Sequence, residues 1–358
     1  MHDLPKRTSG RVAGRKIKVT DVARVAGVSA STVDRVLNSR IGVKPGTVRR
    51  VEEAMASLGY SVNSLAARLA TPIFGVDVVL PLGGNPFFEM LRAEFRRQGE
   101  RLADYGCDVR VNDVDVFDTA SLAAFLREYR PPKARVLIIV AHDAPEVRHE
   151  IDVLMRLGVP VITLVSDNIR SSRKAFVGID NFSAGRTAGA LMARFLAARD
   201  GTIGVIVGHL GLRDHLDRRS GFEQIIAQLK PKSDIRLLGA SRDKSELAAQ
   251  IAVAAFETHR DIVGIYNVGA ANEGLFASLR SLPNMQHAVV ISHELNAVTR
   301  QALLDGTCDA LIVQDVVELA RRALDTAAKT SLPLPQIVPD GHMSIGIMIK
   351  ENLPWLAA

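Results

Sequence analysis

The sequence has no long hydrophobic run. No uninterrupted apolar stretch approaches the roughly 18 residues that a membrane-spanning helix needs. The first 19 residues are basic and contain glycine, and they lack the apolar stretch and the small-residue cleavage site of a secretory signal. We therefore expect a cytoplasmic protein that does not contact a membrane.

Cysteine is also scarce. Cys107 and Cys308 lie far apart in the sequence, and neither belongs to a CxxC motif or lies beside clustered histidines. This spacing suits neither a disulfide framework nor a metal site. The sequence predicts two reduced, buried thiols, no metal ion and no cofactor.

Several catalytic motifs are missing. The sequence contains no G-x-S-x-G elbow, no H-E-x-x-H pair and no GxxxxGK[ST] phosphate loop, and the glycines of GTIGVIVGHLG lack dinucleotide-binding spacing. Asp, Glu and His, which often act in catalysis, do occur at predicted strand ends, so an enzyme is a rival interpretation. We expect no catalytic residues and no enzymatic activity.

Most of the chain has no excess of positive charge. Residues 1–75 hold 13 Lys and Arg against 5 Asp and Glu, a net of +8, whereas the remainder holds 32 against 34, a net of −2. A basic module on a near-neutral body suits binding to phosphates, because each neutralised phosphate releases counterions. Basic segments can also serve only as solubilising tails.

Residues 18–38 are typical of two short helices around a tight turn. Gly27 ends the first helix, and Ser29 is a good N-cap for the second. A third helix runs from Pro45, a residue that suits a first helical position, to a stop at Gly59. The inward-facing positions of the first two helices are Val22, Ala23, Ala26, Val33, Val36 and Leu37. This pattern predicts a helix-turn-helix closed by a third helix.

The head resembles that of LacI-family repressors. The run VTDVARVAGVSASTVDRVLN, the helix ending in LGY and the segment NSLAARLA match the family's head and hinge in order and spacing. The resemblance implies that the second helix enters the major groove of double-stranded DNA, where residues at its start select bases. The DNA-contacting positions that it implies are Thr20, Ser29, Ala30, Ser31, Thr32, Arg35, Asn38, Asn63 and Leu69.

The chemistry of these side chains leaves alternatives open. Arg35 can fork onto guanine O6 and N7 or bind a phosphate. Ala30 and Ser31 can offer only a methyl contact or a single hydrogen bond. Asp34 stands where the family usually has Ser, and it can accept from cytosine N4, pair with Arg35 or lie solvated on the helix surface.

The hinge segment shows one departure from the family. In LacI-family repressors two hinges pack in the minor groove and a leucine wedges between base pairs, and Leu69 occupies that position here. Val62 replaces the usual proline before the hinge helix. Instead of inserting between base pairs, Leu69 could pack against the head of its own chain.

From Phe74 onward, short β-branched runs alternate with amphipathic stretches. This βαβ pattern predicts parallel sheets, and two successive sets of strands predict two lobes. The expected fold class is α/β, with a small all-α head and a body of two doubly wound parallel sheets.

The body resembles type I periplasmic binding proteins, in which the chain crosses between lobes three times. We expect these crossings near residues 183, 313 and 342. The predicted parts are a basic tail 1–17, a helix-turn-helix domain 18–62, a hinge 63–72 and an effector-binding body 73–358, with one lobe at about 73–183 and 314–342 and the other at about 184–313 and 343–358.

Polar and aromatic residues accumulate at the predicted carboxyl ends of strands, where ligands of such sheets bind. Aromatic rings can cover the C–H face of a sugar, while carboxylates, amides and arginine bond its hydroxyls. The candidate ligand residues are Asn85, Phe87, Phe88, Asp167, Asn168, Arg218, Asn267, His293, Glu294 and Gln314.

Some of these residues depart from the family or have structural explanations. Arg218 falls where the family holds a ligand-clamping arginine, but Asn168 replaces a second arginine of ribose-type sites and Glu294 replaces a shorter Asp. Asn267 could cap a helix, Phe87 could lie in the core, Asp167 could form a turn and His293 could be a buried hydrogen-bonded histidine. Arg218 could instead pair with Asp214 or Asp217.

The combined pattern predicts a sequence-specific transcription regulator, most simply a repressor. Its DNA affinity would depend on a sugar or polyol bound between the lobes. A single head contacts one half-site, so we expect a homodimer on a near-palindromic operator. A sugar-binding protein of a transport system would have the same body, and an activator or a corepressor-dependent regulator is also open. The effector, the operator and a tetrameric state are not decided.

Overall fold

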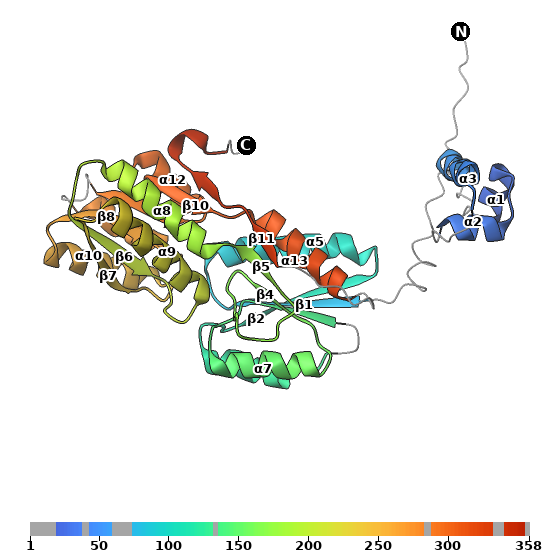
Figure 1. The fold of residues 1–358 in the computed structure, drawn as a ribbon, viewed down its shortest axis with the longest axis horizontal. Helices are drawn as coiled ribbons and strands as arrows, with labels where there is room; N and C mark the ends of the chain where they lie inside the picture. The colour runs from blue at the N-terminus through green and yellow to red at the C-terminus, as the bar shows by residue number, and fades with distance from the viewer. Residues whose placement is uncertain are drawn as a thin grey trace, which may run out of the picture. The chain divides into compact units, whose positions relative to one another are not determined.

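The computed structural model describes residues 19–37, 43–58, 74–131, 135–282, 288–331 and 340–354. The chain divides into two compact units, Met1–Pro72 and Ile73–Ala358, here called the head and the body. Figure 1 shows the helices and strands of both units. None of the helices within the described ranges is long and apolar enough to cross a membrane.

The head consists of three short helices around a small core. They are α1 (Val19–Ala26), α2 (Ala30–Leu37) and α3 (Pro45–Leu58). Gly27 has a φ of +64°, a left-handed conformation that glycine adopts without strain, and it allows the tight turn between α1 and α2. The core cluster contains Val22, Ala23, Ala26, Val33, Val51 and Ala54. The predicted helix-turn-helix is present.

The first lobe of the body contains a six-stranded sheet in the order β11-β5-β4-β3-β1-β2. Every strand pair in it is parallel. Its strands are β1 (Phe74–Pro81), β2 (Cys107–Val114), β3 (Arg135–Ile139), β4 (Val161–Leu164), β5 (Ala175–Ile179) and β11 (Gly341–Met343). The strands β3, β4 and β5 are buried along their whole length, as expected for a parallel sheet covered on both faces.

The second lobe contains another six-stranded sheet, in the order β12-β10-β9-β8-β6-β7. Its strands pair in parallel except β12, which is antiparallel to β10. Its strands are β6 (Thr202–Val207), β7 (Asp234–Ala240), β8 (Ile262–Asn267), β9 (Val289–His293), β10 (Ala310–Val313) and β12 (Gly346–Met348). The predicted α/β class with two parallel-dominated sheets is confirmed.

Helices cover both sheets. The helices of the first lobe are α5 (Pro86–Ala103), α6 (Thr119–Glu128), α7 (Pro145–Arg156) and α13 (Val316–Thr330). Those of the second lobe are α8 (Asn181–Leu196), α9 (Arg213–Leu229), α10 (Ser245–Thr258), α11 (Asn272–Ser281) and α12 (Ala297–Asp305), followed by the short 3-10 helix η2 (Lys350–Asn352). Cys107 and Cys308 are both buried and unbridged, as predicted.

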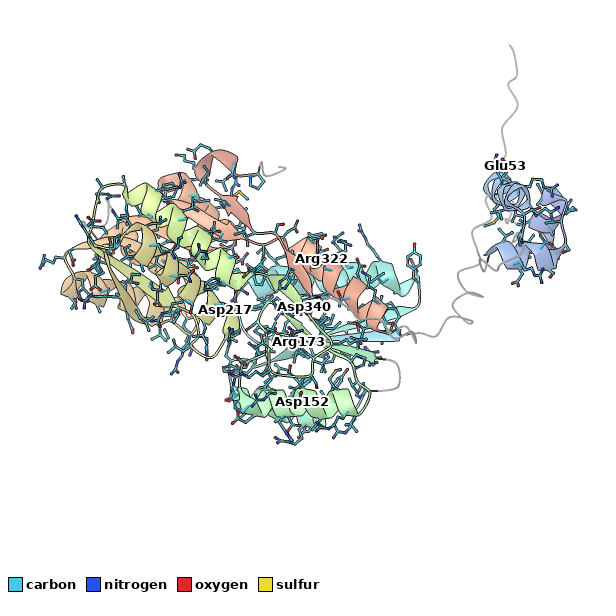
Figure 2. The ribbon with its side chains drawn as sticks, in the orientation of Figure 1. Glu53, Asp152, Arg173, Asp217, Arg322 and Asp340 are labelled. Atoms are coloured by element: carbon cyan, nitrogen blue, oxygen red, sulfur yellow. The ribbon has the colours of Figure 1, made fainter. Side chains whose placement is uncertain are left out.

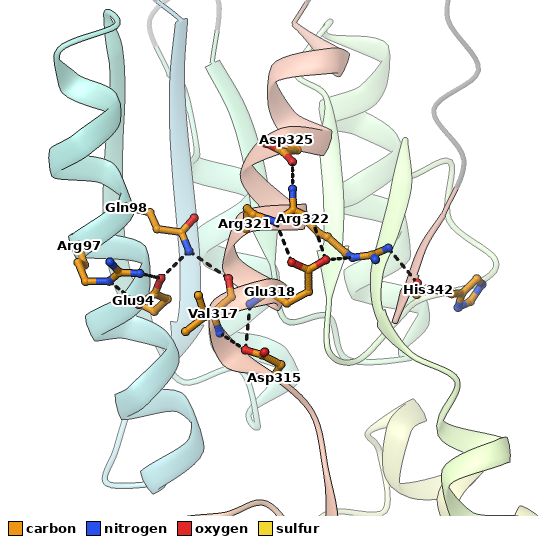
Figure 3. Close-up of polar contacts among 10 residues, drawn as sticks. All are labelled: Glu94, Arg97, Gln98, Asp315, Val317, Glu318, Arg321, Arg322, Asp325 and His342. Carbon is orange, nitrogen blue, oxygen red and sulfur yellow. Dashed lines mark hydrogen bonds and ion pairs between the residues drawn. The ribbon is translucent and has the colours of Figure 1, made fainter. Parts of the chain in front are cut away.

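The helix α13 belongs to the first lobe although it follows a strand of the second. It packs against α5 and against β1, β3, β4, β5 and β11. Figure 3 shows the Gln98 side chain of α5 donating to the Val317 carbonyl at 3.0 Å, and Glu318 binding Arg321 and Arg322 along α13. Arg322 also donates to the His342 carbonyl of β11 at 3.2 Å. These contacts attach the late segments of the chain to the first sheet.

The chain passes between the two sheets after β5, after β10 and after β11. Near these passages Arg173 binds both Asp167 and Asp340. Figure 2 labels Arg173 and Asp340. Asp340 also accepts from the Phe176 backbone N–H at 2.7 Å. The residue before β11 is thereby tied to β5.

Candidate functional site

A cavity lies at the carboxyl ends of strands from both sheets and contains about 530 Å³ of empty space, part of it open to solvent. Its walls come from both lobes: Asn85, Phe87, Phe88, Phe117, Val140, Val165, Leu212, Asp214, His215, Arg218, Asp243, Val268, Gly269, Ala270, Asn272, His293, Glu294, Asn296 and Gln314. Seven of the ten predicted ligand residues belong to this set.

The aromatic wall is formed by the first turn of α5. The side chain of Asn85 caps this helix by accepting from the Phe87 backbone N–H at 3.0 Å, which fixes how the helix begins. The rings of Phe87 and Phe88 lie edge to face with centroids 5.2 Å apart. The Asn85 side-chain amide also donates to Asp243 of the second lobe at 3.1 Å. Asn85 therefore connects the lobes at the cavity.

Arg218 of α9, in the second lobe, also lines the cavity and is only 4% exposed. Its Nε donates to Asn181 Oδ1 at 2.8 Å, and its guanidinium also donates to the Val268 carbonyl at 3.3 Å. Within the described part of the chain it forms no ion pair with Asp214 or Asp217, and Asp217 pairs instead with Arg213. The alternative interpretation of Arg218 as a helical ion-pair partner is therefore wrong.

Glycines place Arg218 at this position. A Cβ on Gly185 of α8 would lie 1.8 Å from the Arg218 carbonyl oxygen, and one on Gly221 would lie 2.1 Å from the Phe182 carbonyl oxygen. Helices α8 and α9 can approach this closely only because both positions lack a side chain. The close packing brings Arg218 to Asn181 at the start of α8.

Glu294 and Gln314 form the next part of the wall. Gln314 donates to Glu294 from its side-chain amide at 2.8 Å and from its backbone N–H at 3.3 Å. Burial raises the pKa of Glu294, and the nearby charge of Arg218 opposes this rise. Glu294 has a φ of +63°, a strained conformation for a residue with a side chain, which occurs often at functional sites.

His293 borders the cavity from β9. Its Nε2 lies 2.8 Å from the Tyr266 hydroxyl, and burial lowers the pKa of the imidazole well below its usual value. The ring is therefore neutral at physiological pH. Tyr266 in turn stacks on Phe222 with centroids 4.4 Å apart.

Three predicted ligand residues do not line the cavity: Asp167, Asn168 and Asn267. Asp167 accepts from Arg173 and from Thr163 at 2.6 Å each. Asn168 donates to backbone carbonyls of residues 142 and 144, and Asn267 donates to the Gly269 carbonyl and to the side chains of Asn272 and Ser292. Their polar groups support turns and neighbouring side chains.

Six further polar or aromatic cavity residues were not among the predicted ones: Phe117, Asp214, His215, Asp243, Asn272 and Asn296. One of them had a usable signal. Asp214 precedes Arg218 by four residues on a predicted helix, so the two side chains share a face. The other five residues join the cavity wall only through the packing of the two lobes, which the sequence does not show.

Contacts between the lobes surround the cavity. The His209 ring of the second lobe stacks on Phe117 of the first with centroids 5.3 Å apart, and it meets His142 edge-on at 6.0 Å. The Asp143 N–H donates to the Gly211 carbonyl at 3.3 Å. Burial lowers the pKa of His142 and of His209. The lobes are closed on each other through these neutral rings.

In the head, the side chains at the start of α2 are exposed. Ser29 caps this helix by accepting from the Thr32 N–H at 3.1 Å, and the side chains of Ser29 and Thr32 lie 2.8 Å apart. Thr20, Ala30, Ser31 and Arg35 are exposed, whereas Val33 between them is buried in the core. The other implied DNA-contacting residues, Asn38, Asn63 and Leu69, lie outside the described residues.

Residues 74–331 match the family model of the periplasmic binding protein domain, so the two-lobed body with its cavity is a domain of that class. Residues 18–63 match the model of bacterial regulatory proteins of the lacI family. The chain belongs to the periplasmic binding protein domain family through its body, and its head carries the domain of the lacI family of bacterial regulatory proteins. The resemblance inferred from the sequence is confirmed.

Individual relatives agree with this family. The chain is 27% identical over 177 residues to the sucrose operon repressor of Streptococcus mutans, covering 44% of this chain and 50% of the relative. It is 27% identical over 256 residues to the ribose operon repressor of Halalkalibacterium halodurans, covering 69% of this chain and 70% of the relative. The chain spans about half the length of the sucrose operon repressors that it matches.

The body also has close neighbours among solved structures. A glucose-galactose binding protein from Geobacillus stearothermophilus superposes with a TM-score of 0.72 at 21% identity, covering 80% of this chain and 100% of that protein. At this identity the likeness concerns the fold alone.

Proposed function

We propose that this protein is a sequence-specific DNA-binding repressor whose operator affinity is controlled by a small sugar or polyol bound between the lobes of the body. The observation that carries the proposal is the presence, in one chain, of a helix-turn-helix head and a polar and aromatic cavity at the carboxyl ends of two parallel sheets. The protein acts in the cytoplasm by binding and catalyses no reaction.

DNA binding is supported by the head. Ala30 and Ser31 at the start of α2 and Arg35 in its last turn are exposed, and the excess positive charge of the chain lies within residues 1–75. In this proposal α2 enters the major groove of the DNA. The sugar-phosphate backbone beside the groove is contacted by Thr20, Ser29, Thr32 and Asn38. Asn63 and Leu69 act in the minor groove.

Effector binding is supported by the cavity wall. Phe87 and Phe88 offer ring faces to the C–H surface of a sugar, and Arg218, Glu294 and Gln314 offer donors and acceptors to its hydroxyls. Two relatives of this chain are named as repressors of a sucrose and of a ribose operon. These names favour a carbohydrate effector.

Control of DNA affinity requires two heads. A homodimer that binds a near-palindromic operator through two half-sites satisfies this requirement. Ligand that binds the closed body better than the open one shifts the population of the two forms, and this coupling is typically worth about 1–3 kcal/mol. We propose that the effector releases the operator.

The main rival is a sugar-binding protein of a transport system, since several solved neighbours of the body are solute binding proteins. Such a protein has no use for a helix-turn-helix. The lacI-family head therefore favours the regulator.

The test begins with selection of a random-sequence duplex library on the full-length protein, followed by mobility-shift titrations of the selected duplex. Ribose, sucrose, galactose and mannitol are then added at millimolar concentration. We expect an enriched near-palindromic site whose binding weakens with one of the sugars or polyols. Failure to enrich any sequence contradicts the repressor, and an enriched site that responds to none of them contradicts the control by this class of effector.

A further inference from the structure

The charges in the cavity wall are unbalanced. Three carboxylic residues, Asp214, Asp243 and Glu294, face the same space as one guanidinium, that of Arg218. Two donors of Arg218 are already engaged by Asn181 and by the Val268 carbonyl. A bound anion would therefore find one guanidinium, whose donors are partly engaged, and three carboxylic side chains.

The three carboxylic residues differ in how the protein uses their oxygens. Asp243 accepts from the Asn85 side chain at 3.1 Å and from the Ala270 N–H at 3.0 Å. Both oxygens of Glu294 accept from Gln314. Asp214 is the exception, because its Oδ1 is buried and has no hydrogen-bond partner among the residues that the structure describes.

Asp214 is 4% exposed and lies in the first turn of α9, where the helix dipole favours a negative charge. Its Oδ2 lies 3.7 Å from His215 Nε2, which is too long for a hydrogen bond. A buried carboxylate oxygen without a donor is costly, so such an atom at a cavity wall indicates a donor on a ligand.

A second acceptor has the same property. Gln314 Oε1 is buried and also lacks a partner within the described ranges, while the amide nitrogen of the same side chain is engaged by Glu294. The residue lies after β10, on a different element from Asp214. Two elements thus present unused acceptors to one space.

We propose that Asp214 is a ligand-contacting, specificity-determining residue and that the cavity takes a carbohydrate that donates several hydrogen bonds and has no negative charge. The inference rests on the proposed function and narrows the ligand class of the same cavity. Free sugars and polyols satisfy the unused acceptors of Asp214 and Gln314 through their hydroxyls. Phosphorylated sugars and sugar acids place an anion among carboxylates, where like charges repel strongly because water is largely excluded.

The first experiment uses matched ligands and the full chain. Ribose, glucose, galactose and mannitol are compared with ribose 5-phosphate, glucose 6-phosphate, galactose 6-phosphate and mannitol 1-phosphate, and the two hexoses also with glucuronate and galacturonate. Thermal-shift assays identify binders, and calorimetry gives their affinities. We expect at least one uncharged compound to bind and its anionic form to bind at least about a hundredfold more weakly, the expected effect of a buried like-charge contact.

The second experiment uses two variants of one helix. Asp214→Asn keeps the size of the side chain but removes its charge, and we expect about tenfold weaker binding of the uncharged sugar, as for a lost charge-assisted hydrogen bond. Asp217→Asn is the matched control, because Asp217 pairs with Arg213 and does not line the cavity. Melting of both variants without ligand checks that they fold.

Three outcomes overturn the inference. An anionic compound that binds more tightly than its uncharged form contradicts the ligand class but leaves a carbohydrate-controlled repressor intact. Unchanged affinity in a folded Asp214→Asn variant removes Asp214 from the site. Absence of binding by every compound contradicts both this inference and the proposed effector.

Discussion

Replacing Arg218 with alanine should weaken effector binding and leave the folding of the head unchanged. The substitution removes a buried guanidinium that borders the cavity and donates to Asn181 and to the Val268 carbonyl. The head belongs to the other compact unit, so its folding and its binding to DNA should be retained.

The contacts of Arg218 set the size of the expected effect. Each hydrogen bond from this cation to a ligand hydroxyl contributes about 1.5–3 kcal/mol. Loss of one or two such bonds weakens effector binding by about tenfold to about twenty-thousandfold. The charge of Arg218 also counteracts the raised pKa of Glu294, so in the variant this pKa rises further and Glu294 stays protonated to higher pH.

Calorimetric titration with an effector identified by screening measures the change. At about 100 times the dissociation constant the effector should stabilise the wild-type body by about 2.7 kcal/mol. Arg219→Ala is the matched control, since this neighbour pairs with Glu223 on α9 and does not line the cavity. An affinity of Arg218→Ala within threefold of wild type would refute the assignment, as would an equal loss in both variants.

Four further results are expected. The free energy of unfolding should fall between about pH 7.5 and pH 5.5 because burial depresses the pKa of His209 and of His142, so the unfolded chain binds more protons than the folded one; His209→Gln should flatten this dependence in thermal melts. Gly185→Ala should destabilise the body by about 1–3 kcal/mol, because its Cβ meets the Arg218 carbonyl, whereas Gly84→Ala, with open space, should not. DNA affinity should fall about a thousandfold between 50 and 200 mM salt if about six phosphates are contacted. Leu69→Ala should weaken operator binding in mobility shifts but spare non-specific binding.

Each of these results has a contrary outcome. An unchanged pH dependence in His209→Gln, when the exposed His149→Gln behaves in the same way, places the titration elsewhere. Equal melting of the two glycine variants contradicts the close helix packing. Affinity that hardly changes with salt contradicts a phosphate-binding head, and equal losses on operator and non-specific DNA make Leu69 a structural residue.

The fold was predictable because its signals are local. Runs such as ARVLIIVA and VPVITLVS form buried strands since they are β-branched and bounded by turn residues, and the helix-turn-helix follows from Gly27, Ser29 and the apolar spacing around them. The general position of the cavity followed from the strand ends. These signals require no knowledge of which distant segments meet.

The finer assignment of the site depended on long-range contacts. Asp167 looked like a ligand residue at a strand end, but its carboxylate binds Arg173, which also reaches Asp340 far along the chain. The stack of His209 on Phe117 joins two lobes and has no local signature. Arg218 meets Asn181 because glycines let α8 and α9 approach closely.

The threading of the body affects how the protein is made. The first sheet begins with β1, yet its edge strand β11 and its covering helix α13 follow the whole of the second sheet except β12. On the ribosome, the first lobe therefore starts first but stays incomplete until α13 and β11 are synthesised, with the face that receives Leu319 and Ala323 uncovered in the meantime. The head has no such dependence, because its three helices and core are contiguous in sequence. A head can thus be exchanged between proteins as one segment, whereas neither lobe can be exchanged by a single cut and join.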